Sequence, residues 1–305
     1  MHYSVFDAHC DTLCAVLDRG KSIAANDCHV DLKRMGAYEK YTQVFACFIA
    51  PEYRHCALSR CIDLIDAYKY SKANGILSIE GGECIEDVET LHMLYNEGVR
   101  IAALTWNDTN RLAAGADEKD RKKGLTAFGK KIVREMDKLK MTVDVSHLND
   151  KAFYDVLEIS KRPIAATHSN SRAVCPHRRN LTDDMFLKIC ERGGVAGINF
   201  YPPFLSASGR ANIDDIVKHI EHFMSLGGEN HIGIGADFDG VDCLPEGICG
   251  CEDTYKVFDR LLQLNYSEET VEKISHKNFE RIFEGAVKCQ DFLCRGRISE
   301  MKKLK

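Results

Sequence analysis

The sequence lacks long hydrophobic runs, an excess of basic charge and any Cys-x-x-Cys pair. Its apolar runs have the length of single strands, well short of the ~20 residues that cross a bilayer. A net charge of −5 excludes a general affinity for nucleic acid or anionic membranes. The chain starts directly with a strand pattern and ends in a charged segment, without a secretory signal or lipid-anchor tail. We therefore expect a cytoplasmic protein that does not bind membranes.

Cysteine, in contrast, is abundant, with fourteen residues in 305. Many lie inside apolar segments, as Cys47 and Cys84 do, where cysteine behaves as a small hydrophobic residue. Without an export signal we expect these thiols to be reduced. The loop-like cluster Cys243, Cys249 and Cys251 lacks the paired spacing of a zinc site, so a metal-binding role for it is not favoured.

Eight short apolar segments, often rich in β-branched residues, predict buried strands. They cover residues 4–9, 43–49, 75–79, 100–105, 141–146, 163–167, 194–200 and 231–236. Helical patterns separate them, over residues 54–73, 85–96, 127–139, 149–161, 182–192, 213–226 and 251–264, and a last helix is expected over 268–284. This alternation has no repeat or linker. It predicts an α/β fold in one domain over residues 1–305, a (β/α)8 TIM barrel with an extra C-terminal helix.

Chemistry in such a barrel lies at the carboxyl ends of the strands. The polar residues there are mostly imidazoles and carboxylates, namely His9, Asp11, Glu80, His147, His168, Asp237 and Asp239. Gathered in one mouth, these groups would repel and desolvate one another without a cation. Imidazole together with carboxylate is the ligand mixture that suits zinc and similar divalent ions.

The spacing of five of these residues indicates two metal positions. His9 and Asp11 share one face of a strand, because alternate residues do, so both can reach one metal. Glu80 has two carboxylate oxygens and can bridge two metals, and His147 and His168 would complete the second site. Two metals ~4 Å apart can share a hydroxide and activate it at neutral pH.

Each of these residues also has a structural interpretation. A single histidine at a strand end is usually a hydrogen-bonded structural residue, but three on one sheet edge favour a metal site. Glu80 could instead begin a helix, and Asp239 is interpreted as a turn residue before Gly240. Asp237 lies nearer its strand and is interpreted as functional. Histidines within helical patterns are interpreted as solvent-facing: His92, His219, His222 and His276.

The loop after the sixth strand carries a pair of arginines, Arg178 and Arg179, next to His177. Paired arginines are usually surface charges. Above a metal site, however, one of them can hold a substrate carboxylate in a bidentate fork. His177 is a further candidate for contact with a substrate.

Six motifs, at residues 6–12, 79–82, 143–147, 167–169, 178–180 and 235–241, together resemble the membrane dipeptidase (renal dipeptidase) family of zinc peptidases. The resemblance is to a soluble, bacterial-type member. It implies a barrel of the metal-dependent hydrolase type with two zinc ions that hydrolyses dipeptides, often with a D-residue at the C-terminal position. It implies the same five metal ligands, and it adds Asp237 as the acid/base and Arg179 as the group that holds the substrate's C-terminal carboxylate.

One position departs from the family pattern. Better-known animal members carry a histidine after the fourth strand, where this chain has Trp106 followed by Asn107. Indole N–H and amide N–H₂ groups can both donate a hydrogen bond. Trp106 and Asn107 are therefore substrate-binding candidates that could support the carbonyl oxygen of the substrate, and the departure puts the substrate range in doubt.

The predicted reaction is attack of a zinc-bridging hydroxide on the scissile carbonyl of a dipeptide, with Asp237 carrying the proton to the departing amine. The alternatives are another binuclear-metal amidohydrolase or lactonase, and a catalytically silent metal-binding barrel. The His9-x-Asp11 pattern argues against the first, and the complete ligand set argues against the second. The sequence leaves open which dipeptide is used, which metal is native and whether the chain forms a homodimer.

Overall fold

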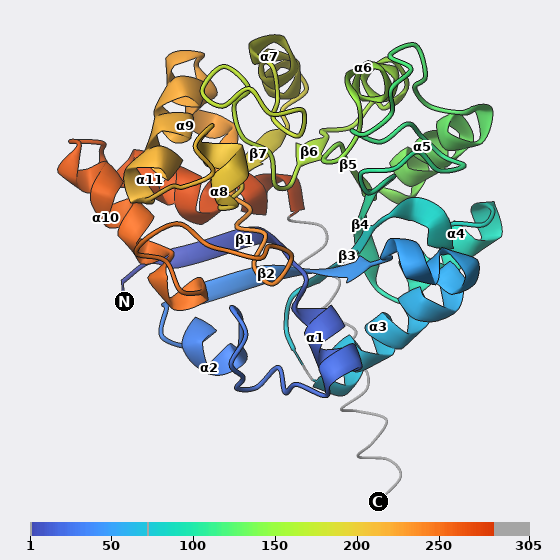
Figure 1. Cartoon of the computed structure of the whole chain (residues 1–305), viewed down its shortest axis with the longest axis horizontal. Helices are drawn as coiled ribbons and strands as arrows, with labels where there is room; N and C mark the ends of the chain where they lie inside the picture. The colour runs from blue at the N-terminus through green and yellow to red at the C-terminus, as the bar shows by residue number, and fades with distance from the viewer. Residues whose placement is uncertain (1, 72, 284–305) are drawn as a thin grey trace, which may run out of the picture.

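The strands form a closed parallel barrel in chain order, in which β1 pairs with both β2 and β8 (Figure 1). The computed structural model describes residues 2–71 and 73–283. The strands are β1 (Ser4–Cys10), β2 (Lys40–Phe48), β3 (Ile76–Glu80), β4 (Val99–Ala103), β5 (Thr142–Asp144), β6 (Ala165–Ala166), β7 (Val195–Ile198) and β8 (Ile232–Ile234). The predicted (β/α)8 fold is confirmed.

Helices surround the barrel (Figure 1). They are α1 (Thr12–Arg19), α2 (Leu32–Met35), α3 (Ala57–Ser71), α4 (Val88–Asn96), α5 (Ala127–Leu139), α6 (Asp150–Ile159), α7 (Asp183–Glu191), α8 (Pro202–Leu205), α9 (Ile213–Ser225), α10 (Tyr255–Gln263) and α11 (Glu268–Glu272). The short turns η1 (Pro51–Cys56), η2 (Gly82–Cys84), η3 (Gly228–Asn230), η4 (Cys251–Asp253) and η5 (Lys273–Lys277) add to them. The connection between β1 and β2 contains α1 and α2. Within the described residues, no helix is both long and apolar enough to span a bilayer.

Strands β5 and β6 are shorter than the apolar runs of the sequence predict. Residues 163–167 contribute only Ala165–Ala166 to the β ladder. Beyond them, side chains replace the backbone ladder: Thr167 N donates to Asp144 Oδ1 at 3.0 Å, and His168 N donates to Ser146 Oγ at 3.2 Å. The chain therefore leaves the regular sheet where polar side chains take over its hydrogen bonds.

The extra C-terminal helix closes one end of the barrel. It begins after Ser267, whose Oγ accepts from Thr270 N at 3.1 Å, and the predicted last residue, 284, lies outside the described residues. The Phe279 and Phe283 rings stack on Phe6 of β1, with centroids 5.5 and 5.6 Å apart. A Cβ at Gly233 would lie 2.3 Å from the Phe279 ring, so β8 needs glycine there. This apolar closure leaves the opposite end for chemistry.

His219 contradicts the sequence interpretation, because its ring is fully buried. Nδ1 accepts from Ser171 N at 3.1 Å, and Nε2 donates to Leu205 O at 3.0 Å. The ring thus joins the loop after β6 to the short helix after β7. In contrast, His222 is partly exposed beside Asp183, and His92 is exposed beside Glu135. The buried positions of α9 recur with helical spacing, and position 219 falls on that apolar face.

We expect acid to weaken folding through His219. Burial lowers the pKa of His219 to about 4, from 6.5. Between these values the unfolded chain binds more protons than the folded chain, so the free energy of unfolding falls as the pH drops. The His219 contribution to this fall is about 2 kcal/mol between pH 7 and pH 5. Urea denaturation of the metal-free protein at both pH values measures it.

The comparison variant is His219→Gln, which removes the titrating ring. Between pH 7 and pH 5, the free energy of unfolding of His219→Gln should fall by about 2 kcal/mol less than that of the wild type. His92→Gln, at an exposed ring, should keep the full loss. Equal losses in the wild type and His219→Gln would contradict the assignment.

Candidate active site

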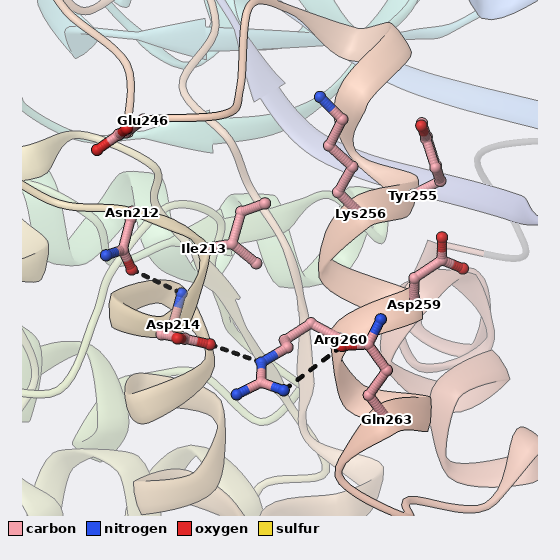
Figure 2. A pocket seen from close by; sticks show the side chains of 9 residues that line it. All are labelled: Asn212, Ile213, Asp214, Glu246, Tyr255, Lys256, Asp259, Arg260 and Gln263. Carbon is pink, nitrogen blue, oxygen red and sulfur yellow. Dashed lines mark hydrogen bonds and ion pairs between the residues drawn. The ribbon is translucent and has the colours of Figure 1, made fainter.

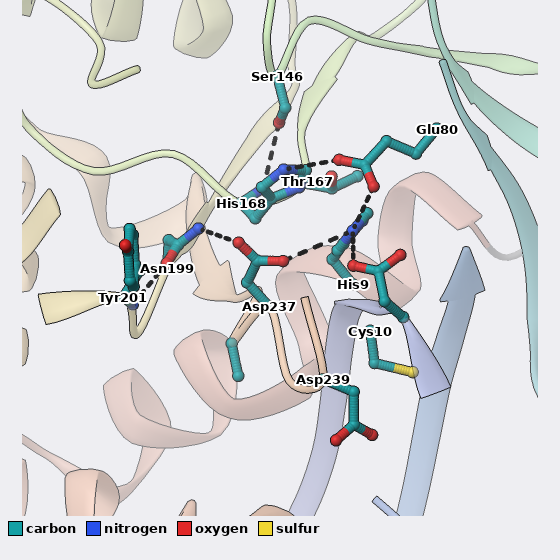
Figure 3. Close-up of polar contacts among 12 residues, drawn as sticks. His9, Cys10, Glu80, Ser146, Thr167, His168, Asn199, Tyr201, Asp237 and Asp239 are labelled. Carbon is teal, nitrogen blue, oxygen red and sulfur yellow. Dashed lines mark hydrogen bonds and ion pairs between the residues drawn. The ribbon is translucent and has the colours of Figure 1, made fainter. Parts of the chain in front are cut away.

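Side chains from the ends of β1, β3 and β8 meet at one point above the barrel (Figure 3). His9 Nε2 lies 3.4 Å from Asp11 Oδ2, 3.4 Å from Glu80 Oε2 and 3.8 Å from Asp237 Oδ1. All four residues are at most 8% exposed. One imidazole and three carboxylates therefore share a space that water hardly reaches.

The second carboxylate oxygen of Glu80 faces two further imidazoles. Glu80 Oε1 lies 2.8 Å from His147 Nε2 and 3.5 Å from His168 Nε2. The two Nε2 atoms lie 2.8 Å apart. Glu80 thus stands between two groups of potential ligand atoms, each compact enough to surround one ion. The structure brings together all five residues that the sequence nominates as metal ligands.

Hydrogen bonds on the far side of each ring fix the orientation of His147 and His168. Asn107 Oδ1 lies 2.9 Å from His147 Nδ1, so it accepts the proton there. Thr167 Oγ1 donates to Asp144 Oδ2 at 2.5 Å, which leaves it to accept from His168 Nδ1 at 2.8 Å. Both Nε2 atoms therefore carry lone pairs that point at each other and at Glu80. Such second hydrogen bonds are typical of metal-binding histidines.

The residues fit divalent cations on three observations. Buried His9 Nε2 and Asp11 Oδ1 have no hydrogen-bond partner. A Cβ at position 240 would lie 2.2 Å from Asp11 Oδ2 and 2.5 Å from Asp237 Oδ1, so Gly240 keeps this space free. The donor atoms are nitrogen and carboxylate oxygen, the set that zinc prefers. Only a cation or added protons can reconcile so many lone pairs.

The electrostatics of His147, His168 and Glu80 agree with this fit. Burial, and then the charge of Arg179, lowers the pKa of His147 well below its usual range, and burial does the same to His168. Both rings are therefore neutral, the form that binds metals. Burial, with the neighbouring Asp11 charge, raises the pKa of Glu80 to about 7. A cation between these groups would hold Glu80 as a carboxylate.

Asp237 is held by a residue that sequence reasoning missed. Asn199 Nδ2 donates to Asp237 Oδ2 at 2.8 Å, while Oδ1 faces His9 (Figure 3). Asn199 is itself fixed, because its N–H donates to Asn170 Oδ1 at 2.8 Å and its carbonyl accepts from Asn170 Nδ2 at 2.9 Å. The sequence contains a signal for this residue, because Asn199 is a polar residue that directly follows Ile198, the last residue of β7.

His147 and Asp237 both have left-handed backbone conformations, with φ of 66° and 65°. Non-glycine residues rarely adopt this region, and such strain concentrates at functional sites. Each of these two residues lies three positions beyond the last residue of its strand, at the barrel mouth. Asp239 shares the conformation but has a different task. It lies in the turn before Gly240, as predicted, but its carboxylate binds distant segments: Oδ2 accepts from Thr12 Oγ1 at 2.6 Å and Oδ1 accepts from His29 N at 2.7 Å.

The paired arginines have different environments. Arg178 is half exposed and pairs with Asp117. Arg179 is only 5% exposed, its Nε has no hydrogen-bond partner, and it forms no ion pair with any described residue. Its guanidinium lies 5.5 Å from the centroid of the Phe204 ring, and burial lowers its pKa to about 10. His177 supports the same loop by accepting from Arg179 N at 3.2 Å.

A cavity of about 510 Å³ opens at the carboxyl ends of the strands. Its lining includes Asp11, Glu80, His147 and Asp237, and its walls carry Phe48, Trp106, Asn107, Tyr201 and Phe204. Asn107 uses its amide oxygen on His147. Trp106 lies with its ring centroid 6.2 Å from that of His147. Both candidates after the fourth strand therefore border the cavity.

Another hollow, of about 580 Å³, lies outside the barrel between the start of α9 and α10 (Figure 2). One ion pair joins two of its lining residues, as Arg260 Nε lies 2.6 Å from Asp214 Oδ1. No histidine or cysteine lines it. Likewise, no cysteine in residues 2–71 and 73–283 belongs to a group able to hold a metal. The strand-end cavity is therefore the better candidate site.

Fold and site together define a metal-dependent hydrolase built on a (β/α)8 barrel. Residues 58–292 match the family described as membrane dipeptidase (peptidase family M19). The chain belongs to this family and is a metallo-dipeptidase.

Individual relatives agree with the family match. The chain is 33% identical over 282 residues to an uncharacterized dipeptidase of Schizosaccharomyces pombe, a match that covers 89% of this chain and 67% of the relative. The solved structure of dipeptidase AC, a family M19 metallo peptidase, aligns with a TM-score of 0.86 at 26% identity over 93% of this chain and 98% of that one. A Rhodobacter sphaeroides metallo peptidase, solved with a phosphinate mimic of the dipeptide L-Ala-D-Ala, aligns with a TM-score of 0.83 at 25% identity over 93% and 99%.

We expect the Thr167 hydroxyl to strengthen metal binding through His168. Thr167→Val removes the acceptor for Nδ1–H and the link to Asp144 while nearly conserving volume. Losing such a partner typically weakens metal affinity about 10–100-fold. Competition with a chromophoric chelator measures the affinity without any turnover. Thr167→Ser keeps the hydroxyl and should bind metal nearly as well as the wild type, so equal losses in both variants would contradict this role.

Proposed function

We propose that the chain binds two zinc ions and uses them to hydrolyse dipeptides. His9 and Asp11 would hold one ion, His147 and His168 the other, and Glu80 would contact both. The observation that carries this proposal is the position of Glu80, whose two oxygens face the two groups separately. Two ions held there would polarise a carbonyl and lower the pKa of a bound water.

Arg179 would bind the C-terminal carboxylate of the substrate. It is a buried guanidinium with an unpaired Nε, and a carboxylate ligand would supply the missing partner. A bidentate fork would also fix the orientation of the peptide. Arg179 lies in the loop after His168, a proposed metal ligand. A carboxylate bound by Arg179 would therefore be only one residue from the bond that is cut, and longer peptides would not fit.

Asp237 would move the proton. One of its oxygens faces His9 and the open cavity, and the other is held by Asn199. This arrangement leaves one carboxylate oxygen free to take a proton from the attacking water and deliver it to the departing amine. Asn199 would act as a positioning residue, because it fixes the carboxylate plane without facing the reacting atoms.

The substrate range would include dipeptides with a D-residue at the C-terminal position. This proposal draws on the Rhodobacter sphaeroides relative, whose structure holds a phosphinate mimic of L-Ala-D-Ala. Trp106 and Asn107 would border the bound substrate, since both line the cavity. The complete set of five potential ligands disfavours a catalytically silent barrel.

The decisive experiment is turnover of L-Ala-L-Ala and L-Ala-D-Ala by the purified chain. We expect activity to be lost on chelation and restored by zinc, with about two ions bound per chain. Asp237→Asn should keep the metal but lose kcat by ~10²-fold or more. Asp214→Asn, at a surface carboxylate, should behave like the wild type. Full activity after chelation would contradict the zinc mechanism, and near-normal kcat in Asp237→Asn would remove Asp237 from its role.

The carboxylate site has a separate test that pairs a variant with an altered substrate. Arg179→Ala should raise KM by ~10-fold or more, because a charge-assisted bidentate contact is lost. Arg178→Ala, at the exposed neighbour, should leave KM nearly unchanged. A dipeptide amide lacks the carboxylate, so it should bind the wild type poorly and lose little more with Arg179→Ala. Equal effects of the variant on the acid and the amide would exclude the contact.

A further inference from the structure

The walls of the cavity indicate which dipeptides this chain prefers. With the C-terminal carboxylate on Arg179, the rest of the peptide must run away from the loop after β6. In a closed ring of eight strands in chain order, β2 lies opposite β6. The scissile bond would lie over Glu80 and its neighbours, between these two sides. The N-terminal residue would therefore extend toward the end of β2.

Two aromatic rings stand at that side. Phe48 is the last residue of β2 and lies in register beside Glu80 of β3. It lies on the same strand face as Val44, which packs in the barrel interior, so its ring points into the mouth. On the other side of Glu80, the register partner on β4 is the small Ala103, which leaves room above it. Trp106 occupies this side, three residues further along.

Phe48 and Trp106 form one continuous wall. Their ring centroids lie 5.5 Å apart at an angle of 56°, a usual geometry for an aromatic pair. Both are only partly buried and both line the cavity that holds Asp11 and Glu80. Cys14, in the first turn of α1, lines the same cavity, and burial raises the pKa of its thiol to about 12. We call Phe48, Trp106 and Cys14 the aromatic wall, an apolar surface beside an otherwise charged centre.

Building on the proposed dipeptidase function, we propose that the aromatic wall binds the side chain of the N-terminal residue and selects dipeptides in which this residue is large and apolar or aromatic. Such a side chain leaves water on binding and gains ring contacts with Phe48 and Trp106. Glycine or alanine leaves the wall uncovered. Differences of even one methylene in an apolar pocket change kcat/KM by about 10-fold or more, so the preference should be measurable.

The kinetic test uses the zinc-loaded full chain and two substrate series. In the first, the N-terminal residue varies as Gly, Ala, Leu or Phe before a constant C-terminal alanine. In the second, the C-terminal residue varies after a constant alanine. We expect kcat/KM for Phe-Ala to exceed that for Ala-Ala by about tenfold or more. Trp106→Ala and Phe48→Ala should bring this ratio close to one. Tyr70→Ala, at an 87% exposed ring, should keep it.

The outcomes separate the two proposals. Equal kcat/KM for Phe-Ala and Ala-Ala in the wild type, or a ratio that survives in both wall variants, would overturn the aromatic wall while leaving the dipeptidase function intact. A preference confined to the second series would also overturn it. Absence of turnover on every dipeptide would instead count against the proposed function.

A second measurement needs no variant, because Trp106 is the only tryptophan of the chain. Its fluorescence therefore reports on the wall directly. Non-hydrolysable phosphinate analogues of Phe-Ala and Ala-Ala are titrated into the zinc-loaded wild type, with binding followed in parallel by calorimetry. We expect the Phe analogue to shift the emission to shorter wavelength and the Ala analogue to change it less. Saturating binding of the Phe analogue with unchanged emission would overturn the proposal.

Discussion

The structure depends on one electrostatic arrangement, the carboxylate of Glu80 held between imidazoles that cannot satisfy one another. His147 and His168 donate their Nδ1 protons outward, to Asn107 and Thr167, so their Nε2 lone pairs face inward at 2.8 Å. Bringing such groups together in a buried space costs free energy unless a positive charge joins them. The chain belongs to a metallopeptidase family, and a bound cation would offset this cost.

Near these imidazoles and carboxylates, the barrel departs from regular strand structure. β5 and β6 are the shortest parts of the wall near the imidazoles, and side chains of Asp144 and Ser146 take over backbone hydrogen bonds there. His147 and Asp237 have left-handed backbone conformations three residues after their strands end. The opposite end of the barrel compensates with a dense aromatic closure. Stability and chemistry thus lie at separate ends of one barrel.

Around the charged centre, the loops place polar and apolar groups on different sides. The loop after β6 supplies a buried guanidinium, and His219 holds this loop to the neighbouring one from beneath. The ends of β2 and β4 supply apolar rings on the other side. A small peptide with one free carboxylate and one side chain to bury matches this division between polar and apolar sides. In the proposed function, the departure of Trp106 from the family pattern would bear on substrate choice as well as on the carbonyl oxygen.

The sequence by itself determined the architecture and the identity of the groups at the strand ends. Buried parallel strands leave short continuous apolar runs, and the residue that follows each run must lie at the barrel mouth. The sequence alone therefore places His9, Glu80 and His168 together, although they are far apart in the chain. Helix limits were also close, as in α5, because capping residues such as Thr126 are visible in the sequence.

Only the tertiary structure decided which polar residue serves which partner. Arg178 and Arg179 are identical in type and adjacent. Arg178 pairs at the surface, whereas Arg179 is buried without a counter-ion among the described residues. By sequence, His219 does not differ from the exposed histidines in helices. In the structure, both ring nitrogens form hydrogen bonds to the backbone of other segments, at Ser171 and Leu205. Asn199 acquires its role from Asp237, 38 residues away. Such assignments depend on contacts between distant segments, and local periodicity carries no information about them.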